Sequence, residues 1–321
     1  SEADMDDLYV GVDLGGTNLR CAVVRRNHEI VQRFECPTKA VEGPNHVIDR
    51  IIDGINRALE KSGCGAADIK AAGIGIPGPI NQEEGLVYSA PNLPGWNNVP
   101  LAGIIQNRVG IAAFVENDAN CAGWGEYAVG AGRGCRHMLM VTLGTGIGGA
   151  VIIDGKLHIG RDGTAGELGH VCIEHGGRLC GCGARGCVEA YASAPSVVRR
   201  FWDLVNAGWE SPLAKSSAAV TCQDVFSAAG AGDAVALYVV KKTGEYLGVM
   251  IASMAELLNP EICVIAGGMI LAGETFFSAI RETCLNWNGH PSRTLSILPA
   301  ELGANAGLVG AADHARVRTG G

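Results

Sequence analysis

The feature that most constrains the fold is a glycine-rich turn between two apolar segments, and it occurs once in each half of the chain. The first copy, DLGGTNLR, spans residues 13–20, and the second, LGTGIGG, spans residues 143–149. Each copy joins two segments typical of strands, and each is followed by further helical and strand patterns. Because this order occurs twice, the sequence predicts two similar α/β domains with a cleft between them.

The expected elements follow from apolar periodicity and from the turn residues. We expect strands at 8–16, 19–26, 29–38, 69–78, 111–117 and 261–268, and a unit of strand, glycine turn, strand and hairpin at 137–157. Helices are expected at 45–63, 99–110, 119–130, 233–258, 273–286 and 305–315. Gly63 is the expected C-cap of the first of these helices.

The predicted N-terminal domain contains residues 1–120 plus 300–321, and the predicted C-terminal domain contains residues 121–299. Hinges are expected near 118–123 and 295–305.

Composition limits the classes of partner. The net charge is −8 and the isoelectric point is about 5.5, which argues against nucleic acid or an anionic membrane surface as the main partner. The acidic start of the chain lacks the apolar core of a signal peptide, so we expect a cytoplasmic protein. In that compartment the 12 cysteines are expected to be free thiols or metal ligands.

The two glycine turns are candidate phosphate sites. Gly15, Gly16 and Thr17 offer backbone N–H groups and a hydroxyl, and Asp13 just before them could orient a hydrated Mg²⁺ ion. An ordinary glycine hairpin is the alternative for either turn alone. The second turn, at 144–146, makes a nucleotide the better interpretation. Neither turn is a Walker A loop or a dinucleotide fingerprint, because both lead into strands and neither contains the G-K-[ST] sequence.

A cysteine cluster in the second half has the composition of a structural zinc site. Cys180, Cys182 and Cys187 are closely spaced between glycines, and His170 lies upstream. Three thiolates and one imidazole form a closed tetrahedral site. Free thiols or a disulfide are the simpler alternatives, and Cys172 or His175 could replace one ligand. Glu167 and Glu189 flank the cluster, and a rigid loop with carboxylates would suit the recognition of sugar hydroxyl groups.

These motifs together resemble the ROK family of sugar kinases and sugar-responsive repressors. The matching segments are DLGGTNLR, GIPGPI, ENDANC, LGTGIGG, GELGH, CGCGARGCVE and IAGG, in this order over nearly the whole chain. The resemblance implies an actin-like ATPase (ribonuclease H-like) fold in both domains. It also implies that Asp118 is the catalytic base, which accepts a proton from a sugar hydroxyl. A helix N-cap is the simpler interpretation of Asp118.

The resemblance further implies the residues of the site. The sugar would be bound by Gly78, Asn92, Asn117, Asp118, Glu167, His170 and Glu189. ATP and Mg²⁺ would be bound by Asp13, Gly15, Gly16, Thr17, Asn18, Gly144, Thr145, Gly146, Gly267 and Gly268. Many family members have a lysine at the position of Asn18. Zn²⁺ would be bound by His170, Cys180, Cys182 and Cys187, with the second ring nitrogen of His170 free for the sugar.

Substrate and partners remain expectations. The segment GLVYSAPNLPGWNNVPL is similar to that of the family's glucokinases, so the expected reaction is phosphorylation of glucose at its 6-hydroxyl. DLGGTNLR is also similar to N-acetylmannosamine kinases. N-acetylmannosamine, N-acetylglucosamine, fructose, mannose and allose therefore stay open. A repressor is disfavoured because the first strand begins near Leu8, and a chaperone-like ATPase or a polyphosphate donor is also disfavoured. The resemblance implies a homodimer.

Overall fold

The computed structural model describes residues 7–216, 219–287 and 294–320. Contacts divide the chain into two compact units, and each is described by itself. Unit 1 consists of Ser1–Gly134, Ala150–Gly166 and Glu301–Gly321. Unit 2 consists of Cys135–Gly149 and Glu167–Ala300.

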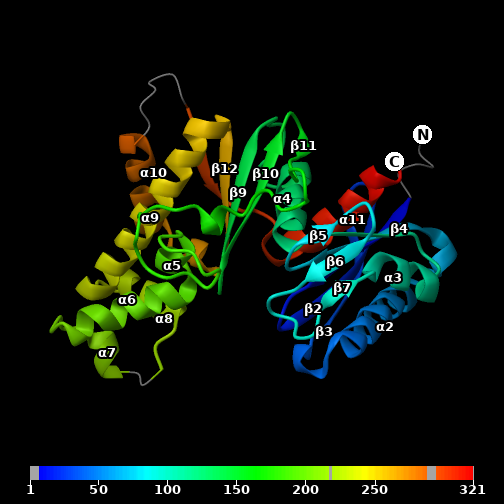
Figure 1. Cartoon of the computed structure of the whole chain (residues 1–321), viewed down its shortest axis with the longest axis horizontal. Helices are drawn as coiled ribbons and strands as arrows, with labels where there is room; N and C mark the ends of the chain where they lie inside the picture. The colour runs from blue at the N-terminus through cyan, green and yellow to red at the C-terminus, as the bar shows by residue number, and fades with distance from the viewer. Residues whose placement is uncertain (1–6, 217–218, 288–293, 321) are drawn as a thin grey trace. The chain divides into compact units, whose positions relative to one another are not determined.

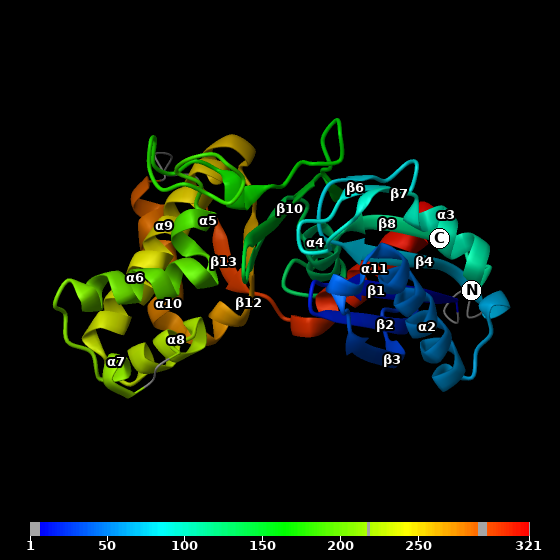
Figure 2. The same ribbon diagram turned by 60° about the horizontal axis from the view of Figure 1, so that its bottom comes forward.

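The first sheet has five strands in the order β3-β2-β1-β4-β8 (Figure 1; all five strands are labelled in Figure 2). Its strands are β1 (Leu8–Leu14), β2 (Asn18–Arg25), β3 (Ile30–Pro37), β4 (Ile69–Ile76) and β8 (Ala113–Asn117). The first three strands form an antiparallel meander, and β4 and β8 run parallel to β1. Strand β4 is apolar at nearly every position because helices cover both faces of the sheet.

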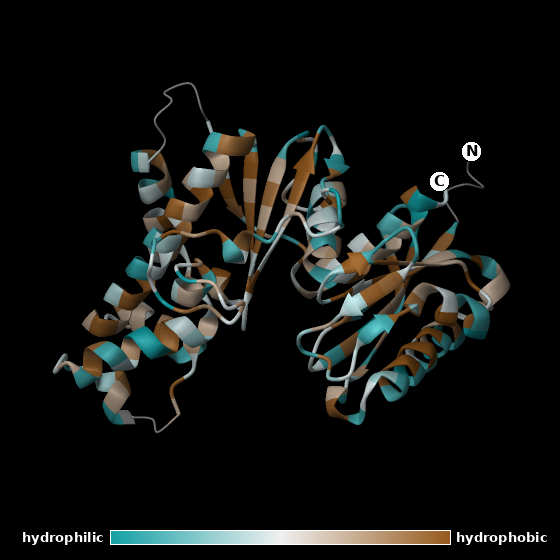
Figure 3. Ribbon diagram, viewed as in Figure 1, coloured by the Kyte–Doolittle hydropathy of each residue, from teal (hydrophilic) through white to brown (hydrophobic). Residues whose placement is uncertain are grey.

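Helices pack on the two faces of the first sheet (Figure 2). They are α2 (Pro44–Ser62), α3 (Leu101–Val109), α4 (Asp118–Val129) and α11 (Ala306–Arg318). Helix α2 buries Val47, Ile51 and Ile55, which lie on one side of the helix at a spacing of four residues. Figure 3 shows this alternation of apolar and polar residues along α2. The helix ends at Gly63, which has a φ of 69° and is the expected C-cap.

Helix α11 covers the other face in direct backbone contact with the sheet. Gly11 and Gly73 are paired across β1 and β4. A Cβ atom on Gly73 would lie 1.8 Å from the carbonyl oxygen of Ala311, so no larger residue fits there. Gly310 makes an equally close contact with α4, where its Cβ would lie 1.7 Å from the oxygen of Cys121. Glycine at these positions therefore allows α11 to approach both the sheet and α4.

A small sheet also belongs to unit 1. It has the order β5-β6-β7 and consists of β5 (Ile80–Asn81), β6 (Leu86–Ser89) and β7 (Asn97–Val99). These strands were not expected from the sequence, because segments of this length carry too little periodicity to be recognised.

The second large sheet has the order β11-β10-β9-β12-β13, which is the order of the first sheet. Its strands are β9 (Met138–Leu143), β10 (Ile147–Ile153), β11 (Lys156–Leu157), β12 (Ile262–Gly267) and β13 (Ser296–Pro299). Strands β12 and β13 are parallel to each other, and β12 is parallel to β9. The expected recurrence of one α/β topology is confirmed.

The helices of unit 2 lie between β11 and β13 along the chain. They are α5 (Glu189–Ala192), α6 (Ala194–Asn206), α7 (Pro212–Ser216), α8 (Cys222–Gly230), α9 (Ala234–Leu258) and α10 (Glu274–Trp287). The side chain of Asp233 caps the start of α9, and Asn259 ends it with a φ of 46°. Gly244 and Gly248 on α9 allow α10 to pack closely against it. The long helix expected at 233–258 is confirmed, whereas α6 and α8 were not expected.

The two compact units differ from the division expected from the sequence over two segments, and also at Ala300, which groups with unit 2. Residues 121–134 and 150–166 group with unit 1. The first difference has a clear cause, because α4 packs closely on α11 through Gly125 and Gly310. The expected hinges near 118–123 and 295–305 stay predictions.

Candidate active site

The Asn117–Asp118 pair lies where β8 ends and α4 begins. The Oδ1 atom of Asn117 accepts hydrogen bonds from the backbone N–H of Ala119 at 2.9 Å and of Asn120 at 3.2 Å. Asn117 is therefore the N-cap, and the simpler interpretation of Asp118 as the cap is wrong. Asp118 is the first residue of the helix and is half-buried. Its Oδ1 atom accepts from the backbone N–H of Ala119 at 2.8 Å, so the carboxylate lies at the N-terminus of the helix.

Gly78 and Asn92 are two further residues of unit 1 that are expected to bind the sugar. Each lies next to another expected site residue. The Nδ2 atom of Asn117 donates to the carbonyl oxygen of Gly78 at 3.4 Å. Gly78 has a φ of 106°, and a Cβ there would lie 2.2 Å from the oxygen of Ser89. Asn92 lies against the first glycine turn, because a Cβ on Gly16 would be 3.0 Å from the Cβ of Asn92.

The first glycine turn is held at both ends. The N–H of Gly15 donates to the oxygen of Asn18 at 2.9 Å, and the hydroxyl of Thr38 donates to the oxygen of Gly15 at 2.6 Å. Asp13 forms an ion pair with Arg20 at 3.2 Å. Burial raises the pKa of Asp13, and the Arg20 guanidinium opposes that rise. The turn thus presents an exposed Thr17 beside a carboxylate.

The second glycine turn is held by the segment that follows the cysteine cluster. The N–H of Ala194 donates to the oxygen of Gly144 at 2.9 Å. The Oε2 atom of Glu189 accepts from the N–H of Ile147 at 2.8 Å. Gly144, Thr145 and Gly146 are themselves exposed, so their backbone N–H groups can reach a ligand.

A cavity of about 400 Å³ lies beside this turn. It is lined by Leu143, Gly144, Ala194, Cys222, Gln223, Phe226, Ser227, Gly230, Gly268, Met269, Leu271 and Ala272. The volume and the mainly apolar wall suit a nucleoside. Gly144 and Gly268 were expected at the nucleotide, whereas the residues of α8 were missed because no motif marks them. Gly267 has a φ of 99° and lies against the backbone of Leu143, so it shapes the turn below the cavity.

The cysteine cluster brings four potential metal ligands together. One ligand atom from each of His170, Cys180, Cys182 and Cys187 lies within 4.8 Å of every other. The distance from Cys182 Sγ to Cys187 Sγ is 3.7 Å, and that from Cys180 Sγ to His170 Nδ1 is 3.8 Å. Ligands at about 2.3 Å from a tetrahedral Zn²⁺ ion are separated by roughly the same distance. The donor set and its spacing therefore fit zinc.

The two alternative ligands lie outside this convergence. The thiol of Cys172 donates to the carbonyl oxygen of Arg185 at 3.7 Å. Among the described residues, the group of converging ligand atoms contains neither Cys172 nor His175.

Burial raises the pKa of Cys187 to about 12, so a metal must displace its proton in order to bind.

The sugar-facing candidates of unit 2 adjoin the cysteine cluster. Glu189 bridges it to the second turn, because its Oε1 accepts from the Cys180 thiol at 3.6 Å while its Oε2 binds Ile147. His170 directs Nδ1 towards the thiols, which leaves Nε2 for another partner. Glu167 is exposed at the start of the short helix η3 (Leu168–His170).

Among the described residues, no helix combines the length and the apolar character needed to span a membrane.

The chain matches the model of the ROK family over residues 9–318. It is 40% identical over 281 residues to a glucokinase of Halalkalibacterium halodurans, with coverage of 86% of this chain and 85% of the relative. It is 39% identical to a glucokinase of Thermotoga maritima, with coverage of 97% and 98% respectively.

Solved structures agree with this relationship. A crystal structure of a ROK family glucokinase from Streptomyces griseus, in complex with glucose and AMPPNP, superposes with a TM-score of 0.83. It is 36% identical, and the match covers 97% of this chain and 99% of that one. The expected fold class is confirmed by this match. The chain belongs to the ROK family.

Proposed function

We propose that the protein is a sugar kinase that transfers the γ-phosphoryl group of ATP to the 6-hydroxyl group of glucose. The observation that carries the proposal is the placement of Asp118 at the N-terminus of α4, fixed by the Asn117 cap. Relatives that are glucokinases, at 40% and 39% identity, support the sugar.

In the proposed reaction, Asp118 accepts the proton of the glucose 6-hydroxyl. The oxygen forms a bond to the γ-phosphorus, the bond between that phosphorus and the β–γ bridging oxygen breaks, and ADP leaves. Most of the acceleration of phosphoryl transfer comes from positioning and charge neutralisation, and a placed base adds about 10²- to 10⁴-fold. Asn117, Asn92 and the backbone of Gly78 would bind neighbouring hydroxyl groups, and Glu167, His170 and Glu189 would bind others.

The two glycine turns would bind the phosphates of ATP. Gly15, Gly16, Thr17 and Asn18 supply one set of donors, and Gly144, Thr145 and Gly146 supply the other. When bound, Mg²⁺ neutralises phosphate charge, and Asp13 would orient its water ligands. The cavity beside Gly268 would bind the nucleoside, which favours ATP over polyphosphate as the donor.

We assign Zn²⁺ to His170, Cys180, Cys182 and Cys187 as a structural ion. The four protein ligands complete a tetrahedral site and leave no position for substrate. Its role would be to hold the segment that carries His170 and Glu189. A cytoplasmic location, where ATP is abundant, and a homodimer of the family type complete the proposal.

A panel of sugars tests the proposed function. The purified protein is assayed with ATP and Mg²⁺ on glucose, mannose, fructose, allose, N-acetylglucosamine and N-acetylmannosamine, with ADP detection. Glucose is expected to give the highest kcat/KM, and glucose 6-phosphate is expected as the product. A higher kcat/KM for an N-acetylated sugar would reject glucose as the substrate. Absence of any sugar-dependent ADP formation would reject the kinase itself.

A further inference from the structure

Glu116 is a buried carboxylate that directly precedes the Asn117–Asp118 pair. It is only 1% exposed, although a buried carboxylate is costly unless hydrogen bonds compensate for its lost hydration. It lies at the end of β8, on the face of the first sheet that α11 covers. Nothing in the reaction proposed above uses this residue, so its burial needs another explanation.

Polar groups of its own strand and of three other segments surround this carboxylate. Its Oε1 atom accepts from the backbone N–H of Asn117 at 2.8 Å, from Asn120 Nδ2 at 2.9 Å and from Gln82 Nε2 at 3.3 Å. Its Oε2 atom lies 3.6 Å from Nε2 of His314 on α11. Burial lowers the pKa of His314.

Two of these donors lie on either side of Asp118. Asn117 precedes it, and Asn120 is 1% exposed in the first turn of α4. One oxygen atom of Glu116 therefore ties the end of the strand to the start of the helix. The Asn117 side chain also caps this turn, so the backbone on both sides of Asp118 is fixed by two separate sets of bonds.

We propose that Glu116 is a positioning residue that sets the orientation of Asp118 towards the sugar hydroxyl. The inference rests on the proposed function, because it assumes that Asp118 is the base. Displacement of a reacting group by about 1 Å can cost about 10²-fold in rate, so small shifts of this turn should reduce turnover.

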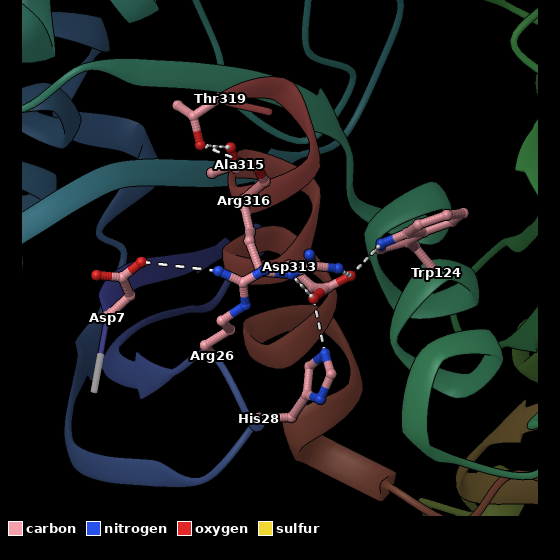
Figure 4. Close-up of polar contacts among 8 residues, drawn as sticks. All are labelled: Asp7, Arg26, His28, Trp124, Asp313, Ala315, Arg316 and Thr319. Atoms are coloured by element: carbon pink, nitrogen blue, oxygen red, sulfur yellow. Dashed lines mark hydrogen bonds and ion pairs between the residues drawn. The ribbon is translucent and has the colours of Figure 1, made fainter. Parts of the chain in front are cut away.

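Asp313 offers a matched control. It is another buried carboxylate of unit 1 and also connects α11 to α4, through a 2.8 Å hydrogen bond from Trp124 Nε1 (Figure 4). Its other bonds are to His28 at 2.6 Å and Arg316 at 2.7 Å. These partners lie on α4, on α11 and between β2 and β3, and they do not include the turn at Asn117.

The test compares Glu116→Met, Glu116→Gln and Asp313→Asn in the full-length protein, at a temperature well below every Tm. Methionine removes the acceptor at similar size, and we expect kcat to fall about 10²-fold while KM for ATP changes less than about twofold. Glutamine keeps an acceptor oxygen for Asn117 and should restore kcat to within about fivefold of the original. Asp313→Asn should lower Tm but leave kcat unchanged.

The outcomes separate the inference from the function on which it rests. If Asp118→Asn keeps full turnover, the proposed base is wrong. If Asp118→Asn abolishes turnover but Glu116→Met does not lower kcat, only the positioning role is overturned. Equal losses of kcat in Glu116→Met and Asp313→Asn would also overturn it, because general loosening would then explain both. If Glu116→Met does not fold, Asn120→Ala serves instead, with a decrease in kcat of about tenfold expected and an unchanged kcat contradicting the role.

Discussion

The two large sheets have the same strand order but are covered in different ways. In the first sheet, Gly11 and Gly73 are paired across the central strands. Counted from the glycine turn, the same places in the second sheet are held by Met140 and Val264, which are also paired and fully buried. The central pair of the first sheet therefore has no side chains, whereas the corresponding pair of the second sheet has the side chains of methionine and valine.

The difference shows how one topology serves two purposes. The absence of side chains at Gly11 and Gly73 allows the backbone of α11 to lie directly on the first sheet. This contact brings His314 to Glu116, behind the Asn117–Asp118 turn. In the second sheet the side chains pack in the ordinary way. The cysteine cluster and α8 lie outside the second sheet, in the long segment between β11 and β12.

Asp118→Asn has the largest expected effect, and it tests whether the base lies at the turn between β8 and α4. Loss of the base should lower kcat by about 10²- to 10⁴-fold, or about 3–5 kcal/mol of barrier. Affinity for ATP should not change, because Asp118 belongs neither to the cavity nor to the two glycine turns. Steady-state kinetics and nucleotide titration measure the two effects. A kcat close to that of the original protein would remove Asp118 from the base role.

Cys187→Ser tests whether the long segment depends on its metal. About one zinc ion per chain is expected in the original protein and none in the variant. The KM for glucose should rise at least about tenfold because His170 and Glu189 lose their support. Elemental analysis and kinetics provide the measurements. Cys172→Ser, in the same segment, is the control and should keep its zinc; equal zinc content in all three proteins would refute the site.

Gly73→Ala probes the close contact between α11 and the first sheet. The new Cβ would lie 1.8 Å from the oxygen of Ala311, so backbone must shift and the free energy of unfolding should fall by about 2–3 kcal/mol. Urea unfolding gives the change. Gly103→Ala on α3, where no atom lies within 4 Å of the new Cβ, should be neutral or stabilising by up to about 1 kcal/mol. Similar losses in both variants would mean that the contact is not special.

The sequence predicts local features of this chain better than features built from distant segments. The two large sheets and the four converging metal ligands depend on short motifs or on strong periodicity, so they could be recognised, whereas the helix cap was expected at Asp118 and lies at Asn117. The wall of the cavity could not, since Phe226 and Met269 become neighbours only through folding. The environment of Glu116 was hidden for the same reason, because Gln82 lies 34 residues away along the chain. The roles of the sugar-binding residues stay predictions.

Ser227→Tyr tests the cavity of the second unit with the smallest expected effect. Ser227 is an exposed residue of α8 that lines the cavity, so a larger side chain can fill part of the space without disturbing the core. We expect KM for ATP to rise about tenfold, or about 1.4 kcal/mol, while KM for glucose and the Tm change little. Ser253→Tyr, on the exposed side of α9, is the control and should leave both KM values unchanged. If Ser227→Tyr left the KM for ATP unchanged, the nucleoside would have to bind elsewhere, and the assignment of the nucleoside to the cavity beside the second glycine turn would lose its main support.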